Sequence, residues 1–533
     1  MQSVRVQLTQ PIEQAQSALP RAAAQALGID VAQMAGLQVL RKSIDARKGQ
    51  VRFSYALAVQ VAEGVCLRGN VQTIAPPQVP SFVRGRVPLS CRPVVIGAGP
   101  CGMFCALTLA QHGYRPIVLE RGQDVRIRQR QVQAFFAGAS HDEENNVLFG
   151  DGGAGTFSDG KLTARGRDGF AAMVLEGLMA HGAPQEIGYL AKPHIGTDRL
   201  TGVIARIKQC ILELGGTWHN GARVVDLAVR GGRLCEVVYE CGGQVVHLPC
   251  TQAVLATGHS ARDVYVMMQR LGVQLAFKPF AVGVRVEHPQ TMIDQAQYGA
   301  YAGHPQLGAA EYALTAQVGE RGVYTFCMCP GGTVVPSISQ SGCLCVNGMS
   351  EHARNGQNAN AAVVVQVQQS DCGQGALSGV AFQQKWERRA FDYARDYMAP
   401  AQRLEDFLAR RRTMRFGDVQ PSYPRGVAGA DLNGLLPRFV IQGLTGAFAQ
   451  FGRKLRGFDR PDAVLTGVEM RTSAPVRIVR TEDRQAAGLL GLYPAGEGAG
   501  YAGGIVSAGA DGIKTAFQIM TAFAPALTQG VDM

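Results

Sequence analysis

The 533-residue sequence predicts an α/β fold of three parts, in which a nucleotide-binding domain with a mainly parallel sheet is interrupted by an inserted domain. Three observations lead to this expectation. An apolar strand, a glycine turn, a helix and a second strand follow one another from residue 92. A similar strand, glycine turn and small-residue helix occupy residues 491–516, and a strand-rich and loop-rich stretch separates the two. We therefore expect an N-terminal α/β module at 1–90, a nucleotide-binding domain at 91–270 and 461–533, and an inserted substrate domain at 271–460.

The N-terminal module is expected to be small and basic. Residues 3–9 alternate like a strand, residues 12–28 have a helical composition disturbed by Pro20, and 36–47 and 50–61 are two more strand-like runs. Residues 1–90 contain ten Lys and Arg against four acids, out of a net charge of +11 for the chain. Such a charge could bind nucleic acid, but the module has few aromatic residues for base stacking. A solvated basic face is the favoured interpretation, and a nucleic-acid partner is not expected.

Composition argues against a membrane protein and against a disulfide scaffold. No apolar run approaches the roughly 18 residues that span a bilayer. The first residues lack the layout of a secretory signal, so we expect a cytoplasmic protein whose 13 cysteines are reduced and mostly packed. Two Cys-x-Cys pairs, Cys327/Cys329 and Cys343/Cys345, lack the Cys-x-x-Cys spacing of zinc and iron–sulfur sites. We therefore expect no metal site.

The segment RPVVIGAGPCGMFCALTLAQHGYRPIVLERG carries the most specific motif. Gly97 permits the tight turn, Gly99 lets the backbone approach a pyrophosphate, and Gly102 lets helix and strand pack closely. The helix N-terminus then offers free N–H groups and a partial positive charge to phosphates. Glu120 ends the second strand, where a carboxylate accepts hydrogen bonds from ribose hydroxyls. The complete unit predicts a Rossmann-like dinucleotide-binding domain.

Three further glycine-rich segments lie elsewhere in the chain. They are FGDGGAGTFSDGKLTARG (149–166), AVLATGHSARD (253–263) and GLYPAGEGAGYAGGIVSAGADGIKTA (491–516). With the first motif they resemble the two-dinucleotide-binding-fold flavoproteins, and among these the uncharacterised bacterial FAD-dependent dehydrogenases, or NAD(P)/FAD-dependent oxidoreductases. Six more segments match that group and extend the resemblance over nearly the whole chain: RKSIDARKG (41–49), KPHIGTDRL (192–200), FCMCPGGTVV (326–335), VNGMS (346–350), PSYPRG (421–426) and GVEMRTSAPVRIVR (467–480).

The resemblance implies that the cofactor is FAD, and it implies a set of residues that hold it. The ADP half would be held by Gly97, Gly99, Pro100, Gly102, Glu120 and Arg121. The pyrophosphate and the flavin edge would be lined by Gly152, Gly153, Gly155 and Thr156, and the adenine side would be closed by Ala256, Thr257 and Gly258. The ribityl chain and the flavin pyrimidine edge would meet Gly496, Glu497, Gly503, Gly504 and Ile505. The chain departs from the group's usual serines at Ala474 and Gly509, so no role is expected at these two positions.

Only one complete strand–glycine turn–helix–acid unit is present, because a single helix follows GEGAGYAGG before the sequence ends. We therefore expect no dedicated NAD(P) domain. Electrons would come from transiently bound NAD(P)H, from an organic substrate or from a protein partner.

Catalytic candidates come from the inserted region and from the loop that follows the second glycine turn. An anionic substrate favours arginine, which indicates Arg285 and Arg425, with Tyr423, Lys161 and His194 as possible acids or bases. A salt bridge or a satisfied loop residue is the alternative for each of them. Cys327 and Cys329 could form a labile redox pair, although packed thiols are commoner.

The expected function is that of an FAD-dependent dehydrogenase acting on an unidentified small molecule, with oligomeric state left open. Two alternatives remain at this point. The protein could modify RNA with the basic module as its grip, or it could be a non-enzymatic flavoprotein that senses redox state.

Overall fold

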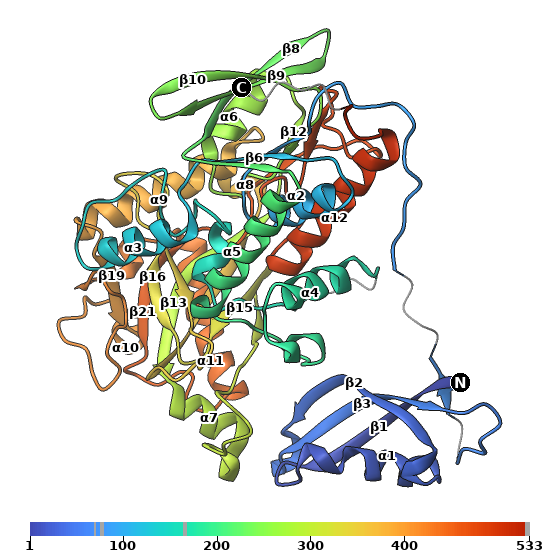
Figure 1. Ribbon diagram of the computed structural model, residues 1–533. Helices are drawn as coiled ribbons and strands as arrows, with labels where there is room; N and C mark the ends of the chain where they lie inside the picture. Colours follow the sequence, from blue (N-terminus) through green and yellow to red (C-terminus); the bar gives the residue numbers. More distant parts are fainter. Residues whose placement is uncertain (69–70, 75–78, 164–167, 528–533) are drawn as a thin grey trace.

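The computed structural model describes residues 1–68, 71–74, 79–163 and 168–527. The N-terminal module is a four-stranded sheet in the order β2-β3-β1-β4, covered on one face by helix α1 (Figure 1). Its elements are β1 (Gln2–Pro11), α1 (Leu19–Leu27), β2 (Met34–Asp45), β3 (Arg52–Val61) and β4 (Gln72–Thr73). The expected start of this helix at residue 12 was wrong, because α1 begins only at Leu19. Pro20 lies in its first turn, where a missing N–H costs nothing, so Pro20 starts the helix rather than disturbing it.

The module contacts the rest of the chain through the outer edge of β2. The backbone of Lys42 donates to the carbonyl of Tyr189 and accepts from the N–H of Ala191, both at 2.8 Å. Leu307 belongs to the module's hydrophobic core.

Residues 79–90 then run beside the end of helix α12 (Ile505–Ala522), where the Gly85 N–H donates to the carbonyl of Met520 at 2.9 Å.

The centre of the nucleotide-binding part is a five-stranded parallel sheet in the order β23-β11-β5-β6-β7. The central strands are fully buried, as expected for a parallel sheet covered on both faces. The strands are β5 (Val94–Ile96), β6 (Ile117–Glu120), β7 (Thr217–Asn220), β11 (Ala253–Leu255) and β23 (Leu492–Pro494). This arrangement confirms the predicted Rossmann-like α/β fold.

Helices cover one face of this sheet and a second, smaller sheet covers the other. The first face carries α12 together with α2 (Pro100–Gln111), α4 (Phe170–Ala180) and α5 (Thr197–Glu213), which share one core. Helix α3 (Val125–Phe136) lies next to α5. The opposite face packs against α6 (Arg262–Arg270) and an antiparallel sheet of β8 (Arg223–Arg230), β9 (Arg233–Cys241) and β10 (Gln244–Pro249).

The inserted part is built on a seven-stranded sheet in the order β14-β15-β18-β13-β21-β19-β20. Its strands are β13 (Phe280–Pro289), β14 (Thr315–Val318), β15 (Arg321–Cys329), β18 (Asn358–Val367), β19 (Ala399–Arg403), β20 (Val427–Gly429) and β21 (Val464–Glu469). The hairpin of β16 (Thr333–Pro336) and β17 (Val346–Met349) lies beside it. The helices are α7 (Gln290–Tyr298), α8 (Gln369–Cys372), α9 (Ser378–Ala394), α10 (Leu404–Leu408) and α11 (Arg438–Lys454).

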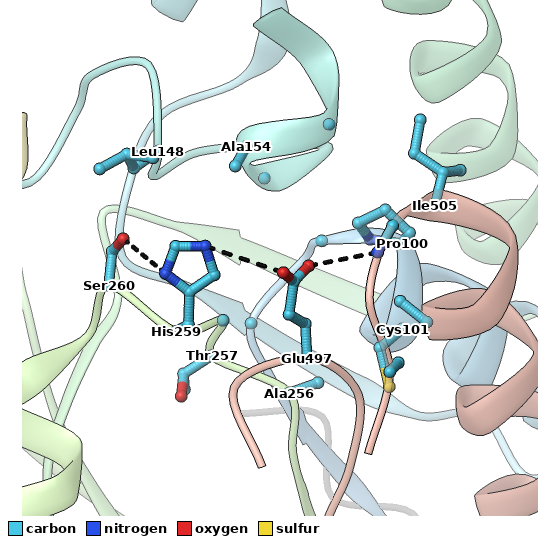
Figure 2. Close-up of a pocket in the computed structure, with 18 of the residues that line it drawn as sticks. Pro100, Cys101, Leu148, Ala154, Ala256, Thr257, His259, Ser260, Glu497 and Ile505 are labelled. Carbon is cyan, nitrogen blue, oxygen red and sulfur yellow. Dashed lines mark hydrogen bonds and ion pairs between the residues drawn. The ribbon is translucent and has the colours of Figure 1, made fainter. Parts of the chain in front are cut away.

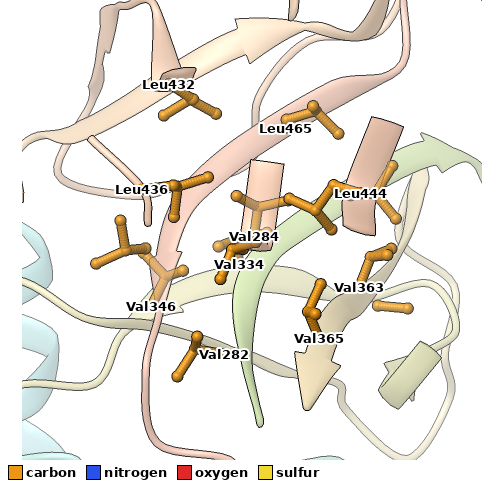
Figure 3. Close-up of a cluster of buried hydrophobic side chains, with 14 of the residues drawn as sticks. Val282, Val284, Val334, Val346, Val363, Val365, Leu432, Leu436, Leu444 and Leu465 are labelled. Atoms are coloured by element: carbon orange, nitrogen blue, oxygen red, sulfur yellow. The ribbon is translucent and has the colours of Figure 1, made fainter. Parts of the chain in front are cut away.

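Branched apolar residues from these strands form the main core with leucines of α11 and its preceding loop (Figure 3). Val284, Val363 and Leu465 come from three neighbouring strands and are fully buried. Because Leu465 belongs to β21, the sheet extends past the expected boundary at residue 460. The sequence pattern missed this because β21 pairs with β13, which lies almost 180 residues earlier in the chain.

The chain enters and leaves the inserted part through two paired strands. β12 (Leu275–Phe277) runs antiparallel to β22 (Val476–Ile478), so the two connections lie side by side. This pairing brings the inserted sheet to the edge of the parallel sheet where the glycine turns are located. Among the helices of the described ranges, none combines the length and the apolar character required to cross a membrane.

Candidate functional site

A cavity of about 560 Å³ lies between the parallel sheet and the inserted part. The turns after β5, β11 and β23 form one end, and residues 153–155 and 158–161 form a side wall. Residues of β15 and β17 form the other end. The carboxyl ends of parallel strands are the usual position for a ligand in such folds.

The first glycine turn has the geometry that its three glycines predict. Gly97 has φ +99°, and a Cβ there would lie 2.5 Å from the carbonyl oxygen of Ala256. A Cβ on Gly102 would lie 1.9 Å from the carbonyl oxygen of Gly97, so this glycine permits close packing of α2 on the turn. Gly99 differs from both, because a Cβ there would meet no protein atom closer than the Cα of Gly153, at 3.9 Å. The space beside Gly99 belongs to the cavity.

Bare backbone from other glycines lines the same cavity. A Cβ on Gly258, Gly503 or Gly504 would have no neighbour within 4 Å. Gly503 and Gly504 immediately precede α12, so the partial positive charge of that helix N-terminus is directed at the cavity. A cradle of unsubstituted backbone with two helix N-termini fits a long cofactor that carries a diphosphate.

Most of the cofactor-site residues expected from the sequence line this cavity. Fourteen do so: Gly97, Gly99, Pro100, Glu120, Arg121, Gly153, Gly155, Ala256, Thr257, Gly258, Glu497, Gly503, Gly504 and Ile505. The other four, Gly102, Gly152, Thr156 and Gly496, lie behind the cavity wall and shape it. For example, a Cβ on Gly152 would lie 2.2 Å from Oγ1 of Thr156, which itself donates to the carbonyl of Asp151.

Glu120 is more deeply engaged than expected. It is buried, and its carboxylate accepts backbone N–H groups from Ala98 at 2.7 Å, Gly122 at 2.9 Å and Gly150 at 2.8 Å. A carboxylate has about four acceptor positions, so these bonds leave little capacity for two ribose hydroxyls. Glu120 therefore fixes the two glycine loops relative to each other while it also lines the cavity.

Arg121 lines the cavity wall but is already paired with acids. Its guanidinium binds Glu144 through two hydrogen bonds, of 2.6 and 3.0 Å, and Asp263 at 3.1 Å. It also lies over the ring of Phe149, at 4.3 Å from the centroid. Arg121 thus belongs to a salt-bridge cluster in the cavity wall.

Glu497, His259 and Ser260 form a chain of polar contacts across the cavity (Figure 2). Oε2 of Glu497 accepts from the Gly504 N–H at 3.5 Å, and Oε1 lies 3.9 Å from Nε2 of His259. Nδ1 of His259 is 3.3 Å from the Ser260 hydroxyl. Burial raises the pKa of Glu497 to about 7, while burial and nearby arginines lower the pKa of His259 to about 4. His259 is therefore neutral at physiological pH, whereas the Glu497 carboxyl gains and loses its proton close to that pH.

Arg285, the first catalytic candidate, is a structural residue rather than a free guanidinium. It is fully buried, and all five of its N–H groups have acceptors. Glu469 accepts two of them, at 2.6 and 3.2 Å, and the other three go to Asn360, Asn347 and the carbonyl of Cys327. The expectation that Arg285 binds a substrate anion directly was wrong, because Glu469 already neutralises its charge.

Tyr423, Arg425 and His194 also lie outside the cavity lining. The Tyr423 hydroxyl donates to the carbonyl of Tyr397, and Arg425 binds the carbonyl of Phe135 and the side chain of Asp396. His194 stacks on His352, and burial lowers its pKa. These three residues hold loops together, which is the structural alternative that sequence reasoning had left open for them.

Lys161 is the basic candidate that does reach the cavity. Its ammonium lies 2.9 Å from Oδ2 of Asp159 and donates to the carbonyl of Met328. Burial lowers the pKa of Lys161, but the adjacent Asp159 charge more than compensates, so the pKa is raised and Lys161 stays charged.

The cysteine pairs have different environments. Cys343 and Cys345 are buried, and so is Cys329, as expected for packed thiols. Cys327 is exposed and lines the cavity, contrary to that expectation. It has φ +43° and occupies a register shift of β15, which turns its side chain out of the sheet. Within the described ranges, no three His, Cys, Asp or Glu side chains are grouped as metal ligands.

Several cavity-lining residues were not identified from the sequence as functional. They are His259, Ser260, Lys278, Phe326, Asn347, Arg471 and Ser473. All except Lys278 belong to or adjoin segments that carry the family resemblance, and that proximity was the available signal. Arg471 and Arg262 share the buried acid Glu387. Burial raises the pKa of Glu387, yet the two arginines hold it at about 2.

Comparison with solved structures gives low overall similarity over much of the chain. A 3-ketosteroid-Δ4-(5α)-dehydrogenase from Rhodococcus jostii RHA1 is 12% identical, with 83% of this chain and 99% of the other covered, and a TM-score of 0.35. A quinol fumarate reductase from E. coli is 12% identical, with 82% and 70% covered and a TM-score of 0.36.

Comparison of sequences gives three family matches and a relative. Residues 279–472 match the profile described as "FAD-dependent protein, C-terminal domain-like", and residues 95–153 match an NAD(P)-binding Rossmann-like domain. Residues 1–60 match a domain of unknown function (DUF8436). An uncharacterised protein from Clostridium beijerinckii is 44% identical over 499 residues, which cover 91% of this chain and 92% of the relative.

Proposed function

The chain belongs to the FAD-dependent oxidoreductase family that it shares with the Clostridium relative, and from this premise we propose that it oxidises or reduces a small molecule at the β15 end of the cavity. The membership confirms the predicted family and the predicted cofactor, FAD. The observation that carries the proposal is the continuity of the cavity. One space of about 560 Å³ runs from the glycine turns to the wall formed by β15 and β17.

In this proposal the N-termini of α2 and α12 would bind different parts of FAD. Gly99, Pro100 and Gly153 lie at the N-terminus of α2 and would hold the diphosphate, whose charge is favoured there. Gly503 and Gly504 precede α12 and would meet the flavin ring, whose reduced form gains negative charge. Glu120 and Ala256–Gly258 would border the adenosine.

Bound FAD supplies the redox chemistry that amino-acid side chains lack. The chain's own contribution is to hold the substrate, to exclude water and to control protons nearby. The Glu497 carboxylate is suited to proton control because its pKa is raised to about 7 by burial. Electrons would arrive from transiently bound NAD(P)H, an organic molecule or a protein.

The basic N-terminal module contributes none of the described residues that line the cavity. Neither this geometry nor the comparisons support the RNA-modifying alternative. No observation on the described residues favours the redox-sensing alternative, and a donor screen distinguishes it from the proposed function.

The test is a donor screen with FAD-loaded protein under anaerobic conditions. NADH, NADPH and a panel of organic donors are added in turn, and bleaching of the visible flavin absorbance is recorded. We expect at least one donor to bleach the flavin and an added acceptor to restore the colour repeatedly. Flavin that dithionite reduces and air reoxidises, but that no donor in the panel reduces, would contradict the proposal and favour a sensory role.

A further inference from the structure

At the β15 end of the cavity, the hydrogen-bonding groups left unused by the protein are mostly donors. The acceptors at this end are already used by the protein. The Asp159 carboxylate receives Arg354 on both oxygens and Lys161 on one. The carbonyls of Cys327 and Met328 accept from Arg285 and Lys161 respectively. A ligand at this end therefore finds few free acceptors on the wall.

Donors at the same end are left over. Lys161 has three N–H groups, of which Asp159 and Met328 take two. Asn347 lines the cavity, and its Nδ2 donates to none of the described residues. The two spare donors come from the side wall and from β17, so they approach the end of the cavity from different elements.

Arg285 determines which way the Asn347 amide points. Nη2 of Arg285 donates to Oδ1 of Asn347 at 2.6 Å, and the Gly348 N–H donates to the same oxygen at 2.8 Å. Both partners are donors, so they must face the amide oxygen and leave the NH₂ group directed elsewhere. Arg285 is itself fixed by two hydrogen bonds that it donates to Glu469, which makes the orientation of Asn347 a consequence of a buried ion pair.

The cations Lys161 and Arg354 are balanced at this end by the acids Asp159 and Glu311. Lys161 and Arg354 share Asp159, and Arg354 also pairs with Glu311 at 2.7 Å. Lys278 also lines the cavity, and its side chain lies beside Gly500 and within reach of the Glu497 charge. Phe326 of β15 is exposed and lines the cavity, and it offers a flat apolar face to a ligand.

We propose that the β15 end of the cavity binds a small organic molecule through an anionic or strongly electron-rich oxygen, such as a carboxylate. Asn347 and Lys161 donate to that oxygen, and Phe326 packs against the carbon skeleton. Arg285 is a positioning residue that orients Asn347. This inference rests on the proposed function and adds a substrate class to it.

Two aromatic probes of similar size and opposite charge test the proposal. Benzoate and benzylamine are titrated separately into FAD-loaded full-length protein, and the visible flavin spectrum reports occupancy next to the cofactor. We expect benzoate to produce a saturable spectral change and benzylamine to produce none over the same concentrations. Benzylamine binding as tightly as benzoate would overturn the proposal.

Two substitutions locate the site. Lys161→Met and Asn347→Asp should each weaken benzoate binding by about tenfold or more, since each removes a donor to an anionic oxygen. Asn347→Asp retains an acceptor for Arg285, so it preserves the buried network while it repels benzoate. Lys385→Met, at an exposed position on α9, is the matched control and should leave benzoate affinity unchanged. Unchanged benzoate affinity in both cavity variants would contradict the assignment.

FAD content is measured in every sample, which separates this inference from the proposed function. Bound, donor-reducible flavin without discrimination between the two probes would refute only the substrate class. Protein that holds no FAD would refute the proposed function itself.

Discussion

The backbones of Gly99 and Gly153 approach closely in the cavity wall, where a Cβ on Gly153 would lie 3.0 Å from the Cα of Gly99, whereas a Cβ on Gly99 would lie 3.9 Å from the Cα of Gly153. The protein therefore leaves room beside Gly99 that its own atoms do not fill. The φ of Gly99 is −72°, which any residue adopts, so a side chain at this position brings no backbone strain.

Gly99→Val should fold normally and lose FAD. The added side chain would occupy the cavity where the diphosphate is expected, so FAD affinity should fall by more than about a hundredfold. Far-ultraviolet circular dichroism and FAD content measure the two effects. Gly434→Val is the control, because a Cβ there meets no atom within 4 Å and Gly434 lies outside the cavity lining. Full FAD occupancy in Gly99→Val would show that the turn does not hold the diphosphate.

Gly102→Val, unlike Gly99→Val, should destabilise the fold itself. Its Cβ would lie 1.9 Å from the carbonyl oxygen of Gly97, so helix α2 cannot pack without moving. We expect a lower midpoint of thermal unfolding even in protein that has never contained FAD. A variant as stable as the wild type would mean that the close approach of α2 and the turn is not needed.

Glu497→Ala should weaken FAD binding by about 1–3 kcal/mol, the range for losing a charged hydrogen-bond partner. Glu497→Gln should cost less, because its amide oxygen can still accept from the Gly504 N–H. FAD dissociation constants, obtained from fluorescence titration of the apoprotein, compare the three proteins. Equal affinities in all of them would mean that this carboxylate does not support the cofactor.

The same residue should make the stability of the FAD-free protein depend on pH. Burial raises the pKa of Glu497 to about 7, above its usual value near 4.5, so the folded state holds this proton more tightly than the unfolded state. The resulting stabilisation is complete below the unfolded pKa and is lost as the pH rises through about 7. The melting temperature of Glu497→Gln, taken relative to wild type, should therefore increase from pH 5 to pH 8. A constant difference across that range would contradict the shifted pKa.

Arg285→Met should destabilise the fold by about 3–5 kcal/mol, because it leaves the Glu469 carboxylate buried without its partner. Removing both charges in Arg285→Met/Glu469→Met should recover much of that loss. Denaturant unfolding of the two single variants and the double variant gives the coupling energy. Additive losses would show that the two residues do not act as a pair.

The local motif of the nucleotide-binding part could be predicted from the sequence because its parts lie close together in the chain. Gly97, Gly99, Gly102 and Glu120 fall within 24 residues, and each one has a role set by backbone geometry. The parallel sheet follows from the same pattern of strand, turn and helix. Such features depend on local conformation, which the sequence reports directly.

The β15 end of the cavity could not be predicted in the same way. Arg285 was expected to bind substrate, but its partner Glu469 lies 184 residues away and neutralises it. Asn347 and His259 gain their significance only from residues that folding brings next to them. The exposed position of Cys327 depends on a register shift in β15, which no periodicity in the sequence reveals. Long-range pairing decides these roles.

The most direct test of FAD binding is the identity of the flavin that the purified protein releases on denaturation. Chromatography of the released material should show FAD and not FMN, because the glycine turn and the space beside Glu120 fit an adenosine diphosphate that FMN lacks. The purified protein should accordingly be yellow, or become yellow when FAD is added. Release of FMN, or colourless protein that FAD cannot reconstitute, would contradict the assignment of FAD as the cofactor.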